Sequence, residues 1–266
     1  MLRKALLQGL LLTLGLAGTL VASAGSMLVD DPPTIAGAPF SGVVNVQSTT
    51  HFADGNRIVR ANAVRYFRDG QGRTRTERQG AGVLAASMTG TSMVTIVDPV
   101  KSQRINLFPG QQVASVIKLP QGAVSHAATV SACSSDTVPP FALLGVGMGI
   151  GAGQYTEATT STVSLGQKVV NGLTATGCRI IRTIPAGVLG NEKPITSTTE
   201  QWVSSELGVT VQMSETSSLG GSVTSNLEQV VLSEPEASLF TVPTGYKTMG
   251  GLTETGASTV TAIGPG

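Results

Sequence analysis

Residues 40 to 79 of the chain read FSGVVNVQSTTHFADGNRIVRANAVRYFRDGQGRTRTERQ. Valine and threonine are frequent in this stretch, and two turn sequences, Asp54-Gly55-Asn56 and Asp69-Gly70-Gln71-Gly72, divide it into three runs. Aspartate and glycine tolerate the backbone conformations of tight turns, so Asp-Gly between β-prone runs is a strong hairpin signal. The stretch therefore predicts three antiparallel strands, over residues 40–52, 57–68 and 73–79.

Similar runs occur further along the chain. Residues 93–98 and 104–108 flank a turn at 98–102, and a second hairpin is predicted around Asn171-Gly172. Its strands and the next three cover residues 163–170, 173–184, 195–203, 208–216 and 223–232. The sequence therefore predicts an all-β fold, a single curved antiparallel sheet over residues 40–246 with short helical pieces near 141–144 and 234–240.

Three segments lack this strand pattern. Residues 25–39 contain Asp30-Asp31-Pro32-Pro33 and are expected to form an extended leader. Residues 121–162 are rich in Ala, Ser, Thr and Gly and are expected to form a long low-complexity loop, an unusual length inside a compact domain. Residues 247–266 are mostly Thr, Gly and Ala, and we expect a disordered tail because such a segment buries little apolar surface.

The first 24 residues have the pattern of a secretory signal peptide. Arg3 and Lys4 precede an apolar run, and Ala22-Ser23-Ala24 has the small residues that signal peptidase requires. Cleavage after Ala24 leaves about 240 residues, enough for one large β domain. We expect a periplasmic or secreted protein that keeps no stable membrane anchor after cleavage.

The charge balance excludes some partners. The chain has 17 Lys+Arg and 16 Asp+Glu, and loss of Arg3 and Lys4 would leave 15 basic against 16 acidic residues. A nucleic-acid partner favours a strongly basic surface, so none is expected. Arginines gather in the first hairpins, where they suit either an acidic partner or a solvated sheet face with cross-strand ion pairs: Arg57, Arg60, Arg65, Arg68, Arg73, Arg75 and Arg78.

No constellation of catalytic residues stands out. Gly147, Gly149 and Ala152 match G-x-G-x-x-A, but that dinucleotide motif needs a strand before it and a helix after it, and this region predicts neither. His51 and His126 are the only histidines, and no G-x-S-x-G elbow accompanies them. Hydrolysis by a triad assembled in space stays open. We predict a non-enzymatic protein with no cofactor.

Cys133 and Cys178 are the only cysteines. They lack the paired spacing of a zinc site or a C-x-x-C redox motif, so no metal site is predicted. In an exported protein two cysteines favour a disulfide over free thiols. The sequence therefore predicts a bridge between Cys133 and Cys178.

Seven segments together resemble a family of uncharacterised exported bacterial proteins: 38–42, 53–59, 68–75, 183–187, 190–195, 200–207 and 234–243. The resemblance covers most of residues 38–246 and implies no known activity. The chain departs from the family at Gly177-Cys178-Arg179, because the resemblance implies a small polar residue at position 178 where this chain has cysteine. More distantly, the architecture is similar to the LolA-like fold of periplasmic lipoprotein carriers, in which a curved sheet wraps a hydrophobic concavity.

These features lead to a functional hypothesis. The chain has ten aromatic residues, so bulky side chains are few and a curved sheet would have room for an apolar or lipid-like ligand. Trp202, the only tryptophan, lies in the predicted strand 195–203 and is the candidate core or ligand-binding residue. The alternatives are a structural or regulatory periplasmic module that binds a protein, and a hydrolase of unknown type.

Overall fold

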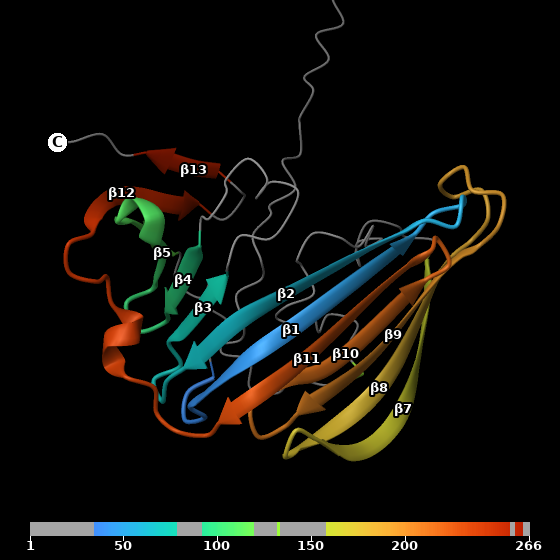
Figure 1. Cartoon of the computed structure of the whole chain (residues 1–266), viewed down its shortest axis with the longest axis horizontal. Helices are drawn as coiled ribbons and strands as arrows, with labels where there is room; N and C mark the ends of the chain where they lie inside the picture. Colours follow the sequence, from blue (N-terminus) through green and yellow to red (C-terminus); the bar gives the residue numbers. More distant parts are fainter. Residues whose placement is uncertain (1–34, 79–91, 120–131, 134–157, 256–258, 263–266) are drawn as a thin grey trace, which may run out of the picture.

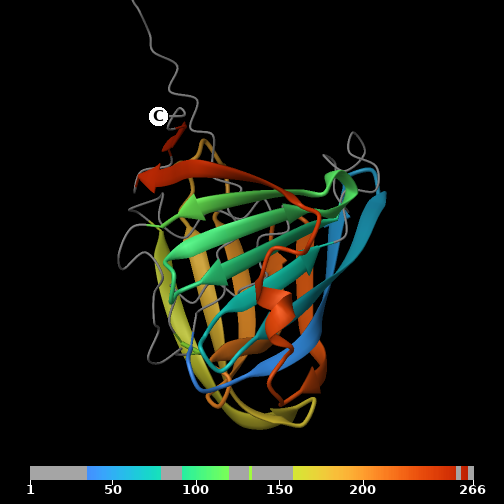
Figure 2. The same cartoon turned by 90° about the vertical axis from the view of Figure 1, so that its left-hand side faces the viewer.

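A computed structural model describes residues 35–78, 92–119, 132–133, 158–255 and 259–262. Within them the chain forms one unclosed sheet, ordered β13-β12-β6-β5-β4-β3-β2-β1-β11-β10-β9-β8-β7, which curves into a half-barrel (Figures 1 and 2). The strands are β1 (Phe40–His51), β2 (Arg57–Arg68), β3 (Thr74–Arg78), β4 (Met93–Asp98), β5 (Gln103–Phe108), β6 (Val113–Lys118), β7 (Thr159–Val170), β8 (Leu173–Ile184), β9 (Ile195–Ser204), β10 (Val209–Ser217), β11 (Gly221–Val231), β12 (Lys247–Thr255) and β13 (Thr259–Ala262). The predicted all-β curved sheet is confirmed.

The turns that the sequence marks form as local hairpins. Gly55, Gly72 and Gly172 all have positive φ, at 86°, 81° and 86°, and Asn171 beside Gly172 has φ 48°. Glycine adopts this backbone region without the steric cost that a Cβ brings. These turns therefore connect β1 to β2, β2 to β3 and β7 to β8.

The far edge of the sheet differs from the prediction. The segment expected to be a disordered tail carries β12, which pairs with β6 in parallel, and β13, which pairs with β12. The chain enters this edge through a hydrogen bond from Lys247 N to Gln112 O, 2.8 Å. β12 supplies the backbone partners that β6 would otherwise lack at a sheet edge. β7 also begins at Thr159, inside the predicted loop.

Other predicted segments lie outside the described residues. They are the signal peptide 1–24, most of the leader 25–39, the helical piece near 141–144 and nearly all of the loop 121–162. The second helical piece is present as the 3-10 turn η2 (Ala237–Phe240). A shorter 3-10 turn, η1 (Pro109–Gln111), precedes β6.

Buried side chains form two main clusters on this sheet. One gathers Phe40, Val44 and Tyr66 with residues of β8, β10 and β11. The other lies where η2 packs on β4 and β5, burying Ile96, Leu107 and Phe240. Arg75 fixes η2 there by donating from Nη1 to Leu239 O, 2.8 Å. The candidate site lies on the strands of the first cluster, from β8 across to β2.

Candidate functional site

The two faces of the half-barrel differ in burial and can be followed from strand to strand. In β1, Val44 and Val46 are buried whereas Asn45 and Gln47 are exposed, as the two-residue period of a strand requires. Residues paired directly across neighbouring strands share a face. We name the face of Val44 and Val46 the concave face, and that of Asn45 and Gln47 the convex face.

One row of paired residues crosses six strands of the concave face and is almost closed to solvent. We name it the buried rung: Cys178, Gln201, Met213, Ser225, Val46 and Asn62. Cys178 is 0% exposed, Gln201 1% and Met213 2%. The buried rung is therefore part of the packed interior.

The next row on the same face is more accessible. We name it the concave rung: Ile180, Thr199, Glu215, Val223, Ser48 and Arg60. All of its members except Ser48 are half-buried. Burial raises the pKa of Glu215 above the usual value for glutamate. The concave rung therefore offers partly accessible apolar side chains and one carboxyl group in a poorly hydrated place.

A short piece of the middle of the chain lies against the buried rung. Cys133 is joined to Cys178 by a disulfide, with their Cα atoms 5.2 Å apart. Gln201 Nε2 donates to Ala132 O at 2.7 Å, and Ala132 packs with Cys178, Val203 and Ile180. A covalent bond and a buried hydrogen bond thus hold Ala132 and Cys133 on the concave face, next to Ile180 of the concave rung.

Trp202 lies on the convex face. It pairs with Gly177 and Gln212, and it alternates with Gln201, which belongs to the concave face. Its ring is half-buried against the main cluster, and Lys168 Nζ lies 3.9 Å from the ring centroid. Strand pairing thus places Trp202 on the face opposite to Gln201 and against the main cluster, and the expected role of Trp202 in ligand binding stays a prediction.

Gly177 explains how Trp202 fits there. A Cβ atom at position 177 would lie 2.5 Å from a ring carbon of Trp202, closer than real contacts allow. The indole ring therefore occupies the space above the glycine, which only a residue without a Cβ leaves open.

We expect Gly177→Ala to lower the free energy of unfolding by about 1–3 kcal/mol, because the added methyl group overpacks the ring of Trp202. Urea denaturation followed by circular dichroism measures this. Gly110→Ala, where a Cβ would meet nothing within 4 Å, is the matched control. In a Trp202→Ala background Gly177→Ala should lose most of its cost; an unchanged cost would show that backbone strain, not the ring, is responsible.

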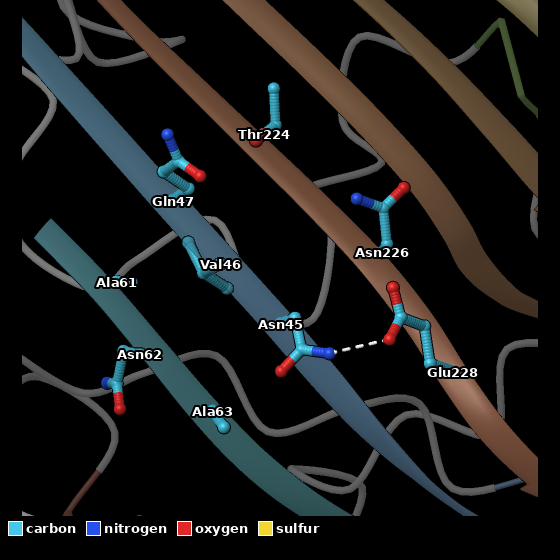
Figure 3. A pocket seen from close by; sticks show the side chains of 9 residues that line it. All are labelled: Asn45, Val46, Gln47, Ala61, Asn62, Ala63, Thr224, Asn226 and Glu228. Atoms are coloured by element: carbon cyan, nitrogen blue, oxygen red, sulfur yellow. Dashed lines mark hydrogen bonds between the residues drawn. The ribbon is translucent and has the colours of Figure 1, made fainter. Parts of the chain in front are cut away.

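The convex face also holds a shallow hollow of about 500 Å³. It is lined mainly by polar side chains of β1 and β11 (Figure 3), which are Asn45, Gln47, Thr224, Asn226 and Glu228, together with Ala61 and Ala63 of β2. Val46 and Asn62, which alternate with these residues along their strands, also border it. Asn45 Nδ2 donates to Glu228 Oε2 at 2.8 Å. This lining suits water and polar groups and does not suit an acyl chain.

The structure does not bring the other sequence candidates together. His51 lies exposed at the end of β1, whereas His126, Gly147, Gly149 and Ala152 are outside the described residues. Of the described residues, no three metal-ligating side chains gather into a metal site. No described helix has the length and apolar character needed to cross a bilayer.

Two arginines of the first hairpins form the ion pairs that a solvated sheet face was expected to have, and a third fits neither of the alternatives that the sequence left open. Arg65 of β2 lies 3.9 Å from Glu77 of β3, as a cross-strand ion pair on a sheet face does, and Arg75 pairs with the same Glu77 along β3 at 2.8 Å. Arg68, in contrast, is fully buried. The sequence analysis did not identify Arg68 as a buried residue or Glu215 as a half-buried carboxyl group. For Arg68 a signal was present, because strand alternation places it on the same face as Val64 and Tyr66.

Comparison with known proteins gives a fold-level likeness only. No protein-family model matches the chain, and no curated protein matches it. Similar solved structures include LprF from Mycobacterium bovis (13% identity, 75% of this chain and 90% of that chain, TM-score 0.31). Another is the Mycobacterium tuberculosis lipoprotein LppX (16% identity, 70% of this chain and 84% of that chain, TM-score 0.26). A third is a LolA superfamily protein from Nitrosomonas europaea (13% identity, 82% of this chain and 97% of that chain, TM-score 0.27).

These matches include the LolA superfamily to which the sequence resemblance points. Their identities are low and their TM-scores lie below 0.5, so they carry no functional inference. The feature of this chain from which a function can be argued is the concave rung.

Proposed function

We propose that the protein is a non-enzymatic exported binding protein that holds an apolar or lipid-like ligand on the concave face of its sheet. One observation carries this proposal. The concave rung is half-buried, in contrast to the closed buried rung beside it, and it presents Ile180 and Val223 on one face with few bulky residues. Partly accessible apolar side chains in a curved wall are what a ligand chain can cover.

The position of Trp202 changes how the proposal is tested. Because its ring lies on the convex face, filling the concave face should leave its fluorescence nearly unchanged. A neutral external probe, N-phenylnaphthylamine, reports on apolar sites directly. We expect saturable enhancement of its fluorescence by the purified protein, and competition by dodecanol.

The matched variants use two neighbouring positions on opposite faces. Ile180→Asp puts a carboxylate into the concave rung and is expected to weaken probe binding about tenfold, or about 1.4 kcal/mol. Val163→Asp is the control, because Val163 pairs with Arg179, next to Ile180, and is 49% exposed. It should change the affinity less than about twofold. A wild-type protein that shows no saturable probe binding would remove the proposal.

A protein-interaction module is the second candidate, and β7 is the observation that favours it. This edge strand is exposed along most of its length, with Val163 and Val169 at 49% and 70%, and Lys168 is its one charged residue. Long edge strands with few charges can pair with a strand of another chain. The second alternative, a hydrolase of unknown type, has no such observation in its favour.

A further inference from the structure

Glu215 is the acidic residue on the concave rung. It lies in β10, paired with Thr199 of β9 and Val223 of β11, between Met213 and Ser217 along its own strand. Ile180 lies beyond Thr199 in the same rung. A carboxyl group is thus placed among methyl-bearing side chains in the wall that the proposed ligand covers.

The strands around Glu215 supply no compensating charge. On the concave face, β9 presents Ser197, Thr199 and Gln201, and β11 presents Gly221, Val223 and Ser225, none of which titrates. The nearest charged groups on this face of the described strands lie further away: Arg182 in β8, beyond β9, and Arg60 in β2, beyond β11 and β1. Burial raises the pKa of Glu215.

The described residues also give the carboxyl group of Glu215 no hydrogen bond and no ion pair. This differs from Asp69, whose carboxylate accepts from Gln71 N, Arg73 N and Arg73 Nε. A half-buried carboxylate without a partner reduces the stability of the folded protein. A cation brought to this position would restore the missing interaction in surroundings where charges are weakly screened.

We propose that Glu215 binds the cationic head group of an amphiphilic ligand, an ammonium group, while the ligand's alkyl chain covers Ile180 and Val223. The inference rests on the proposed function and adds to it the chemical class of the ligand. In this proposal Glu215 selects among ligands that have the same alkyl chain and different head groups. An anionic head group would be repelled by the carboxylate, and a neutral head group would leave the carboxylate unpaired.

The test compares three amphiphiles that share one alkyl chain. Dodecylammonium, dodecanol and dodecanoate each compete with N-phenylnaphthylamine for the full-length exported protein near neutral pH. We expect dodecylammonium to bind at least about tenfold more tightly than dodecanol, and dodecanoate more weakly than either. In Glu215→Gln the advantage of dodecylammonium should fall to about twofold or less, with dodecanol affinity unchanged.

Two further variants separate the role of Glu215 from that of net charge. Glu228→Gln removes one negative charge from the exposed convex face of β11 and should keep the preference for dodecylammonium. Glu215→Asp keeps the carboxylate and should also keep the preference. Lowering the pH should weaken dodecylammonium binding, because protonation of Glu215, whose pKa is raised, removes the negative charge while the amine stays charged.

The outcomes distinguish this inference from the proposed function. Equal affinities for the three amphiphiles, or a dodecylammonium preference that Glu215→Gln retains, would overturn the inference and leave an apolar binding protein standing. Absence of saturable probe binding in the wild type would overturn the proposed function itself.

Discussion

Arg68→Ala should lower the free energy of unfolding by about 3–5 kcal/mol, the combined cost of two carbonyl groups that lose their donor and of the void that the side chain leaves. The side chain of Arg68 is 0% exposed at the end of β2. Its Nε and Nη2 donate to Ala38 O at 2.9 and 2.8 Å, and Nη2 also donates to Leu207 O at 2.7 Å. The guanidinium also lies 4.9 Å from the ring centroid of Phe40.

The expected loss is large because the Arg68 side chain joins β2 to two distant parts of the chain. Ala38 precedes β1 and Leu207 lies in the turn between β9 and β10, 30 and 139 residues away in sequence. Burial lowers the pKa of Arg68, with Tyr66 opposing the shift, yet arginine remains protonated in proteins. Truncation would therefore leave both carbonyl groups unpaired and a void beside Phe40.

Urea denaturation measures this loss, and Arg65→Ala is the matched control. Arg65 lies in the same strand on the convex face, and its side chain is 69% exposed beside Glu77. Removing it should change the free energy of unfolding by less than about 0.5–1 kcal/mol. Arg68→Lys should fall between the two, because an ammonium cannot reproduce the forked geometry. A loss below about 1 kcal/mol in Arg68→Ala would contradict this account.

The hairpins could be predicted because their signals are local. Asp54-Gly55 and Asn171-Gly172 are short turn sequences between strand-forming runs, and the φ values of Gly55 and Gly172 show the backbone that those residues permit. β6 and β12 could not be predicted in the same way. No Asp-Gly or Asn-Gly turn marks β6, and the parallel partner of β12 lies more than a hundred residues earlier in the chain.

The orientation of the site residues depends on register rather than on composition. In β9 the residues Thr198, Thr199 and Glu200 give no alternation between polar and apolar, so the sequence leaves the face of Trp202 undecided. Pairing with Gly177 places its ring on the convex face. Glu215 is likewise unremarkable in sequence, and it becomes distinctive only beside Val223 and Thr199.

Replacing both cysteines, as Cys133→Ser with Cys178→Ser, should lower the free energy of unfolding by up to about 4 kcal/mol. In the chain-entropy model the bridge closes a loop across a separation of 45 residues, which restricts the unfolded chain. The bridge also holds Ala132 where Gln201, 1% exposed, donates to its carbonyl oxygen. Without the bridge, Gln201 loses a tethered acceptor in a place where an unpaired amide destabilises the fold.

The measurement is urea denaturation of wild type and double variant, each with and without reductant. Reductant should lower the stability of the wild type to that of the variant and leave the variant unchanged. A loss of about 4 kcal/mol corresponds to a melting temperature lower by roughly 10 °C in a domain of this size. Thiol counting on denatured, unreduced wild-type protein is the independent check, since two free thiols would show that the bridge does not form. If reductant leaves the stability of the wild type unchanged, the bridge contributes nothing to it. Packing of Ala132 and Cys178 against Val203 would then suffice to hold the segment on the concave face.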